Sequence, residues 1–320
     1  MMRCAILDDY QGVALSLADW SAVEARSYRE RFASIGELAE AIGDCEIVVA
    51  MRERTPFPAE LFERLPALRL LITSGMRNAS IDLKAAAAHG VTVCGTGSSA
   101  TPPAELTWAL ILGLARGLLP ETAAMRSDGP WQQTVGLDLN GAVLGLLGVG
   151  KIGSQVARVG RAFGMDVVGW SPNLTAERAE AAGVRLAPSK EALLREADVV
   201  SLHLVVGEGT RGLLGAAELA LMRPTAYLVN TSRSALVDQD ALVEALRAGT
   251  IAGAGLDVFD EEPLPPGHPF RTLPTVLATP HLGYVTLGNY RTYFGEAVAD
   301  IDAFLAGAPV RVLAGPKELP

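Results

Sequence analysis

Short apolar runs alternate with amphipathic segments along most of the chain. In the first hundred residues, the apolar runs predict buried strands at Arg3–Leu7, Glu46–Ala50, Arg69–Thr73 and Val91–Cys94. Between them, the segments Ser34–Gly43 and Asp82–Gly90 predict helices. Ser34 and Glu37 have the form of a capping box, and both segments end on the glycine that commonly follows a helix. Strands that alternate with helices indicate a parallel sheet with helices on its faces.

A second alternating block follows a long helix predicted at Thr101–Arg116, which has prolines in its first turn. The strands predicted in this block are Val143–Leu147, Asp166–Trp170, Asp198–His203, Thr225–Asn230, Ile251–Leu256 and Val276–Thr279. The helices predicted between them are Lys151–Phe163, Ser189–Glu196 and Asp238–Ala248. We expect a final helix at Leu287–Leu305 to end the regular structure, and the Pro- and Gly-rich tail Gly307–Pro320 to lie along the surface. A chain of 320 residues exceeds one ordinary hydrophobic core, so two domains are expected.

Charge and composition exclude several kinds of partner and site. The net charge of -9 argues against nucleic acid, because phosphate binding needs a basic surface. The longest apolar stretch, Leu106–Leu119, contains Arg116 and is too short to span a bilayer. No signal peptide is apparent, so we expect a cytoplasmic protein without membrane contact. The widely spaced Cys4, Cys45 and Cys94 indicate neither a disulfide framework nor a zinc site, and Cys94 is expected to be an inert buried thiol.

The most specific local feature is a glycine-rich turn between a predicted strand and a predicted helix. The strand Val143–Leu147 runs into Gly148-Val149-Gly150-Lys151-Ile152-Gly153, and a second strand follows the helix. In such a turn the first glycine permits the tight bend, the second lets the backbone approach a pyrophosphate, and the third lets helix and strand pack closely. The helix N-terminus adds N–H donors and positive dipole. This context, rather than the glycines alone, predicts a dinucleotide site.

The usual acidic residue is missing from this site. A carboxylate that holds the ribose 2′-hydroxyl should end the second strand, but Ser171 stands there, followed by Pro172 and Asn173. Because nothing at this position repels a 2′-phosphate, we predict use of both NAD and NADP, with a modest preference for NADP. Arg178, on the next helix, is the nearest basic residue that could pair with the phosphate.

Three further stretches each begin at the carboxyl end of a predicted strand: Asn230–Arg233, Gly255–Pro263 and Thr279–Gly283. Ligands bind at this edge of an open α/β sheet, so an arginine, a carboxylate and a histidine are expected to converge beside the cofactor. A histidine can protonate the oxygen of a keto carbon that receives hydride. A carboxylate on the other ring nitrogen fixes the tautomer, and an arginine fork holds an α-keto acid. This chemistry needs no metal.

With these motifs in this order and spacing, the chain resembles the D-isomer-specific 2-hydroxyacid dehydrogenase family over nearly its whole length. That family includes phosphoglycerate dehydrogenases, glyoxylate and hydroxypyruvate reductases, and D-lactate dehydrogenases. The resemblance implies an oxidoreductase that moves a hydride between NAD(P)(H) and a 2-hydroxy acid/2-keto acid pair, with D-isomer specificity. It places the catalytic arginine at Arg233, the carboxylate at Glu262 and the acid/base histidine at His281.

The resemblance also implies the binding residues. The implied cofactor contacts, together with the serine noted above, are Gly148, Gly150, Lys151, Ile152, Gly153, Ser171, Thr231, Ser232, Asp257 and Gly283. Among them, Lys151 and Ile152 would lie at the pyrophosphate, Thr231 and Ser232 at the nicotinamide ribose, and Asp257 at the nicotinamide amide. The implied substrate contacts are Gly75, Met76, Arg77 and Arg233.

The implied substrate loop is Ser74–Arg77, whose backbone N–H groups would bind the substrate carboxylate. Arg77 stands where the family often has glycine. It either enters the substrate pocket or points to solvent, and the sequence favours neither interpretation. Other residues are expected to be structural: His203 as a hydrogen-bonded strand-end histidine, and Trp108 and Trp131 as packing residues.

The fold class implied is α/β, with two Rossmann-like doubly wound parallel-sheet domains. The cofactor domain, residues 99–284, would be inserted into a discontinuous substrate domain made of residues 1–98 and 285–320. Members of the family are usually homodimers joined through their cofactor domains. Two alternatives stay open: an NAD(H)-sensing binding protein of the same fold, and a related dehydrogenase acting on formate or phosphite. The carboxylate partner of His281 argues against formate, whose oxidation needs no proton relay. The sequence does not name the keto acid, the physiological direction or the pathway.

Overall fold

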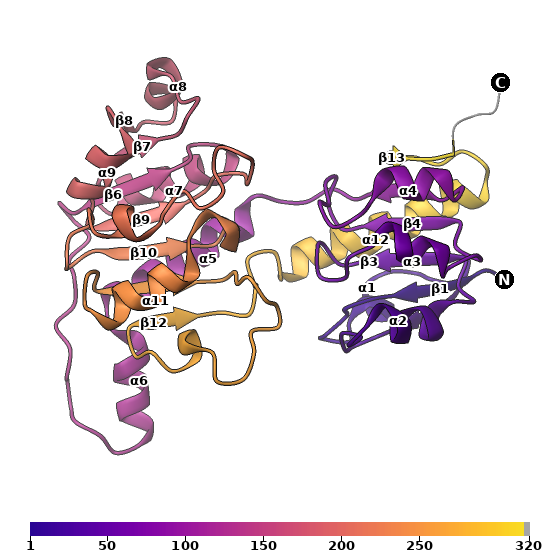
Figure 1. Ribbon diagram of the computed structural model, residues 1–320, viewed down its shortest axis with the longest axis horizontal. Helices are drawn as coiled ribbons and strands as arrows, with labels where there is room; N and C mark the ends of the chain where they lie inside the picture. Colours follow the sequence, from indigo (N-terminus) through magenta and orange to yellow (C-terminus); the bar gives the residue numbers. More distant parts are fainter. Residues whose placement is uncertain (317–320) are drawn as a thin grey trace. The chain divides into compact units, whose positions relative to one another are not determined.

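The computed structural model describes residues 1–316 and divides the chain into two compact α/β units. Unit 1 consists of Met1–Ser99 and the segment that begins at Thr286, and unit 2 is Ala100–Val285. Each unit is one sheet covered by helices, which confirms the predicted fold class (Figure 1). No helix within residues 1–316 combines the length and the apolar character needed to cross a membrane.

Unit 1 contains a six-stranded sheet in the order β13-β5-β4-β3-β1-β2. Its strands are β1 (Arg3–Ile6), β2 (Glu24–Ser27), β3 (Ile47–Ala50), β4 (Leu70–Thr73), β5 (Thr92–Gly95) and β13 (Val312–Ala314). Its helices are α1 (Ala14–Leu17), α2 (Ile35–Ile42), α3 (Ala59–Glu63), α4 (Leu83–Ala88) and α12 (Leu287–Leu305). All neighbouring strands pair in parallel except β13, which runs antiparallel to β5.

The predicted helix starts in unit 1 are correct because their capping side chains form the expected bonds. Ser34 accepts a hydrogen bond from the N–H of Glu37 at 3.1 Å and so begins α2. The Glu37 carboxylate reaches back to the N–H of Ala33 rather than to that of Ser34, so the capping box is shifted by one residue. Asp82 caps α4 by accepting from two backbone N–H groups.

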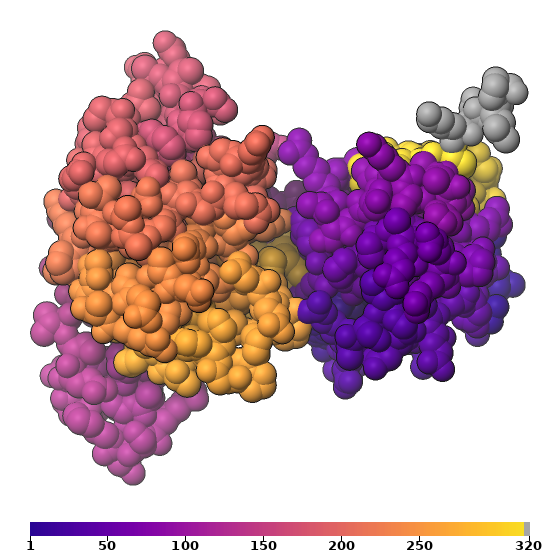
Figure 2. Space-filling view, in the orientation of Figure 1, coloured from indigo at the N-terminus to yellow at the C-terminus, as the bar shows by residue number. Residues whose placement is uncertain are grey.

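The expectation that regular structure ends with the last helix was wrong. After α12 the chain turns back, and Val312–Ala314 pairs with β5 as an antiparallel edge strand. Leu313 and Ala314 pack against the hydrophobic core of unit 1. The proline and glycine content of the tail concealed this short strand, whose hydrogen-bonding partner comes from a segment far away in the sequence. In Figure 2 the yellow atoms of this C-terminal segment lie against the violet atoms of residues from the first part of the chain.

Unit 2 contains a seven-stranded parallel sheet in the order β12-β11-β10-β9-β6-β7-β8. Its strands are β6 (Val143–Leu147), β7 (Asp166–Trp170), β8 (Arg185–Leu186), β9 (Val199–Leu202), β10 (Tyr227–Asn230), β11 (Gly253–Leu256) and β12 (Val276–Ala278). Its α-helices are α5 (Thr101–Ala115), α6 (Leu118–Arg126), α7 (Lys151–Ala162), α8 (Ala176–Ala181), α9 (Lys190–Glu196), α10 (Ala216–Leu219) and α11 (Gln239–Arg247). Two short 3-10 helices, Ser234–Leu236 and Pro269–Arg271, complete it.

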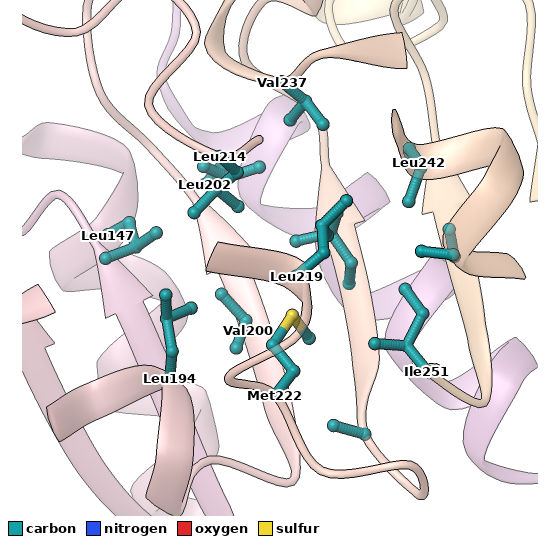
Figure 3. Packing of buried hydrophobic residues seen from close by; sticks show 14 of the residues in the cluster. Leu147, Leu194, Val200, Leu202, Leu214, Leu219, Met222, Val237, Leu242 and Ile251 are labelled. Carbon is teal, nitrogen blue, oxygen red and sulfur yellow. The ribbon is translucent and has the colours of Figure 1, made fainter. Parts of the chain in front are cut away.

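Both faces of this sheet are buried. Successive residues of a strand point to opposite faces, so Val200 and Leu228 join one core cluster while Val199 and Val229 join the other. The first cluster packs under α9, α10 and α11, and Figure 3 shows its central side chains. The second packs under α5 and α7. Burial on both faces accounts for the continuous apolar runs in the sequence.

The segment around Trp131 departs from the prediction. Trp108 is buried and its ring lies 5.1 Å from that of Phe163, which confirms it as a packing residue. Trp131, in contrast, is 76% exposed, so the prediction that it packs within the fold was wrong. It stands among glycine, proline and glutamine with no apolar periodicity that would bring it onto a core. The helix α6 just before it was also not predicted.

Candidate functional site

The order of strands in unit 2 fixes where a ligand can bind. From β6 the chain moves one way through β7 and β8, and then returns to place β9 on the other side of β6. The carboxyl ends of β6 and β9 therefore form the topological switch point, where open α/β sheets bind ligands. The glycine-rich turn follows β6 and His203 follows β9, so both lie at this point.

Two of the three glycines are required by the protein's own packing. Gly148 has φ +107, and a Cβ there would lie 2.6 Å from the carbonyl oxygen of His203. A Cβ on Gly153 would lie 2.1 Å from the carbonyl oxygen of Gly148. These distances are too short for any side chain, so the turn and the first turn of α7 can pack only with glycine at both positions.

Gly150 has a different character. Its φ is -94, which any residue can adopt, and no heavy atom in the described part of the chain lies within 4 Å of where its Cβ would be. Nothing in the protein itself demands glycine here, whereas the close approach of a pyrophosphate would. Gly150 is the N-cap of the twelve-residue helix α7, so the open space adjoins free backbone N–H groups. The residues present therefore fit a dinucleotide.

The backbone of His203 packs against this turn. Its Nε2 lies 2.9 Å from the Ser201 hydroxyl, which confirms the predicted structural, hydrogen-bonded histidine. Burial lowers the pKa of His203 from its ordinary value to about 4, because a charged imidazole would lose its hydration. The ring is thus neutral at physiological pH.

The end of β7 carries no carboxylate. Ser171 is half-buried there, and Pro172 and Asn173 after it are exposed. The Arg178 side chain bends back from α8, and its Nη1 donates to the Asn173 carbonyl at 3.0 Å. A guanidinium therefore lies against the loop that begins with Ser171.

The structure brings Glu262 and His281 together. Oε2 of Glu262 lies 2.6 Å from Nδ1 of His281, and the two side chains are 29% and 20% exposed. Oε1 of the same carboxylate accepts from the Phe259 N–H at 2.9 Å, so the carboxylate is held at both oxygens. Burial alone would raise the pKa of Glu262. The hydrogen bond and charge of His281, the Phe259 N–H and the charge of Arg233 outweigh burial and hold that pKa below its ordinary value.

Arg233 is carried on a turn shaped by Asn230, a residue to which the sequence assigned no role. The Asn230 amide donates to the Arg233 carbonyl at 2.9 Å and accepts from the Ser232 N–H at 3.0 Å. The Arg233 guanidinium in turn donates to the Ser232 carbonyl. A strand-end asparagine that folds back on the next residues is a common turn device, and this was the signal that could have found it.

Thr231 and Ser232 use their hydroxyls inside unit 2. The hydroxyl oxygens of Thr231 and Thr107 lie 2.7 Å apart, which ties the end of β10 to α5. Ser232 donates to the Leu204 carbonyl at 2.7 Å and so links the loops after β9 and β10. The predicted ribose contacts of Thr231 and Ser232 stay predictions.

Asp257 is fully buried and holds the loop that carries His281. Its Oδ1 accepts from the Thr279 hydroxyl and the Leu282 N–H, and its Oδ2 accepts from the Gly283 N–H. Burial raises the pKa of Asp257, against the opposing effect of these hydrogen bonds and of the His281 charge. The bonds stabilise His281 in the left-handed backbone region at φ +54. The implied contacts of Asp257 and Gly283 with the nicotinamide stay predictions.

The ring of Tyr284 packs against His281 on the same turn. The two ring centroids are 5.3 Å apart and the planes meet at 70°. Nothing in the sequence pattern indicated this contact, because it depends on the backbone angles of the turn.

The predicted substrate loop lies in unit 1, at the carboxyl end of β4. Gly75 has φ +88, and its N–H donates to the Thr96 hydroxyl at 3.0 Å. The Arg52 guanidinium donates to the Ser74 carbonyl at 3.2 Å. Met76 and Arg77 are exposed, and no hydrogen bond within residues 1–316 uses their N–H groups. The N–H groups of Met76 and Arg77 are thus available as donors, whereas the N–H of Gly75 already donates to Thr96.

Neither a cluster of metal ligands nor a reactive Cys94 thiol is found among the residues that the structure describes. Residues 1–316 contain no group of three His, Cys, Asp or Glu side chains arranged to hold a metal ion. Cys94 is buried, and burial raises the pKa of its thiol to about 12, which makes it a poor nucleophile as predicted.

Comparison with known proteins agrees with these features. Residues 108–283 match the family described as D-isomer specific 2-hydroxyacid dehydrogenase, NAD binding domain. The chain is 41% identical over 257 residues to a glyoxylate reductase of Aeropyrum pernix, covering 78% of this chain and 76% of that protein. It is 38% identical over 253 residues to a D-3-phosphoglycerate dehydrogenase of Methanocaldococcus jannaschii, covering 78% of this chain and 48% of that protein. The alignment therefore spans about half the length of this second relative.

A solved structure shows the same architecture. The crystal structure of a phosphoglycerate oxidoreductase from Vibrio cholerae superimposes with a TM-score of 0.90 at 36% identity, over 96% of this chain and 100% of that chain. The family predicted from the motifs is confirmed, and so is NAD as a cofactor. The chain belongs to the D-isomer specific 2-hydroxyacid dehydrogenase family, and residues 108–283 are its NAD-binding domain.

Proposed function

We propose that the protein reduces a 2-keto acid to the D-2-hydroxy acid, and catalyses the reverse oxidation, with a nicotinamide cofactor. One observation carries this proposal: the hydrogen-bonded pair of Glu262 and His281 follows strands of the same sheet whose glycine turn, Gly148–Gly153, fits a dinucleotide. The relatives named above, a glyoxylate reductase and a D-3-phosphoglycerate dehydrogenase, act on acids of this kind by name.

The bound nicotinamide supplies or accepts the hydride at the carbonyl carbon. His281 gives its Nε2 proton to the carbonyl oxygen as negative charge develops there, since its Nδ1 is engaged by Glu262. Glu262 fixes the tautomer and stabilises the imidazolium. Arg233 binds the keto acid through its guanidinium and polarises the carbonyl.

The two units contribute different binding residues in this proposal. Unit 2 holds the cofactor on Gly148–Gly153, with Lys151 and Ile152 at the pyrophosphate. Unit 1 binds the substrate carboxylate through the N–H groups of Met76 and Arg77, which no described residue uses. The NAD(H)-sensing alternative lacks a use for the Glu262–His281 pair, because binding a cofactor needs no proton donor.

The cofactor site accepts both NAD and NADP, with a modest preference for NADP. Two observations support this: Ser171 replaces the carboxylate that would repel a 2′-phosphate, and the Arg178 guanidinium lies against the loop that Ser171 begins.

The active form is a homodimer joined through unit 2. Large apolar side chains are exposed on and after α6, namely Leu118, Leu119, Met125, Trp131 and Val135. Exposed apolar residues that recur within one segment of the chain are typical of a protein interface. A sedimentation mass equal to one chain at micromolar concentration would contradict the dimer.

The test is a panel of glyoxylate, hydroxypyruvate, pyruvate and bulkier 2-keto acids, each with NADH and NADPH, followed by the absorbance of the reduced nicotinamide. We expect turnover of at least one acid, and in His281→Ala a loss of turnover on the order of 10²–10⁴-fold with little change in cofactor affinity. Cofactor binding without turnover of any acid would favour the NAD(H)-sensing protein. Near-normal turnover in His281→Ala would contradict the proton donor.

A further inference from the structure

We propose that Tyr284 is a positioning residue that fixes the plane of the His281 imidazole. This inference rests on the proposed function, because it assumes that His281 donates the proton. Tyr284 is only 7% exposed, and its ring lies 5.3 Å from the His281 ring with the planes at 70°. Edge-to-face geometry at this distance is an attractive aromatic contact.

The other restraints on His281 leave one rotation of its ring unrestrained. Asp257 holds the backbone of the loop through the N–H groups of Leu282 and Gly283. Glu262 holds a single ring atom, Nδ1, at 2.6 Å. A ring fixed at its backbone and at one nitrogen can still rock about the line that joins them. Rocking moves Nε2, the atom that must meet the substrate oxygen, farther than any other ring atom.

Tyr284 is placed to stop this motion. It lies three residues after His281, on a turn closed by the hydrogen bond from the Val285 N–H to the Leu282 carbonyl at 2.8 Å. This turn contains Leu282 and Gly283, whose N–H groups Asp257 binds, so the phenol ring shares the anchoring of the histidine loop. The ring is flat, rigid and buried, whereas an aliphatic side chain of similar volume can change rotamer and offers no oriented ring edge or face.

Misplacement of a reacting group by about 1 Å can cost roughly 10²-fold in rate. In Tyr284→Leu we therefore expect kcat for keto acid reduction to fall about 10- to 100-fold, with the KM for the cofactor unchanged. Tyr284→Phe keeps the ring and serves as the matched control, so its kcat should stay within about threefold of the wild type. Tyr284→Met is a second aliphatic variant in case Tyr284→Leu does not fold.

A spectroscopic measurement tests the contact apart from activity. The chain has four histidines, so the imidazole C–H signals of His281 can be assigned in the proton NMR spectrum by their loss in His281→Ala. The neighbouring phenol ring shifts these signals. We expect the shift to persist in Tyr284→Phe and to disappear, with line broadening, in Tyr284→Leu or Tyr284→Met.

The outcomes separate this inference from the proposed function. Wild-type kcat in the aliphatic variants would overturn the positioning role, and equal losses in the aliphatic and Phe variants would do the same, since the ring would then not be the determinant. If His281→Ala keeps normal turnover, the proposed function itself fails. Low kcat in the aliphatic variants, rescue by Phe and an unchanged cofactor KM support the inference.

Discussion

The carboxylate of Glu262 and the imidazole of His281 meet at 2.6 Å although nineteen positions of sequence separate them. Glu262 belongs to the loop after β11, and His281 to the loop after β12. These strands are parallel neighbours, so their carboxyl ends lie side by side and deliver the two side chains to one place.

In the proposed function, this pair sets the pH dependence of the reaction. In Glu262→Gln the imidazole loses the carboxylate that stabilises its charged form. We expect the alkaline limb of the reduction pH profile to move to lower pH. Glu261→Gln changes an exposed neighbour and is the matched control. An alkaline limb that stays in place in Glu262→Gln would refute the pairing in the working enzyme.

In the proposed function, the choice of cofactor depends on Ser171 and Arg178. Ser171→Asp restores a carboxylate that repels the 2′-phosphate, and it should lower kcat/KM for NADPH well below that for NADH. Arg178→Ala should lower kcat/KM for NADPH roughly 10- to 100-fold, the usual range for a lost charged hydrogen bond, with little effect on NADH. Arg195→Ala removes another exposed arginine of unit 2 and should change neither value. A strong preference of the wild type for NADH would show that another group holds the ribose.

The role of Arg77 in substrate choice can be tested with two classes of keto acid. It is exposed at the end of the substrate loop, beside the Met76 N–H. If its guanidinium binds the far end of the substrate, Arg77→Ala should raise the KM of a keto acid with a second acidic group roughly tenfold more than that of glyoxylate. Lys84→Ala, a nearby exposed cation, controls for general charge. Equal small changes for both acids would show that Arg77 points to solvent.

His203 makes stability depend on pH. The pKa of His203 is about 4 in the folded chain, against about 6.5 for an unfolded histidine. Between these values the unfolded chain binds a proton that the folded chain does not. The contribution of His203 to the free energy of unfolding is therefore complete above pH 6.5. The free energy of unfolding falls by about 3 kcal/mol as the pH drops to 4. In His203→Gln this loss should be absent, whereas the exposed-site control His89→Gln should keep it. Urea unfolding of unit 2 from pH 7 to pH 4 measures the difference, and parallel curves for wild type and His203→Gln would contradict the prediction.

The sequence predicted the central strands and the edge strand β12 well, but it missed the other edge strands. Val143–Leu147 and Asp166–Trp170 have the predicted bounds because most of their residues are buried on both faces of the sheet and are apolar. The edge strands β2 and β8 were missed, since Glu24–Ser27 and Arg185–Leu186 are half-solvated and carry charges. The partner of β13 is more than two hundred residues away, and no local pattern reveals it.

The site was predictable as far as motif order and strand ends determine it. The meeting of Glu262 and His281 follows from neighbouring parallel strands. The contact of Tyr284 does not, because it arises from turn geometry such as the positive φ of His281. Local backbone conformations of this kind depend on the completed fold.

The antiparallel strand β13 and the helix α12 also determine when unit 1 can fold during synthesis. The ring of Phe294 in α12 packs on Trp20, and β13 covers the edge of β5, yet both are translated after all of unit 2. At about 5–20 residues per second, the ribosome needs on the order of ten to forty seconds to make the intervening residues. During that interval the nascent N-terminal sheet has an open strand edge and an uncovered apolar face, while unit 2, continuous in sequence, can fold as it emerges. The N-terminal sheet, rather than the NAD-binding domain, is thus the part of the nascent chain that stays incomplete until the last residues are made.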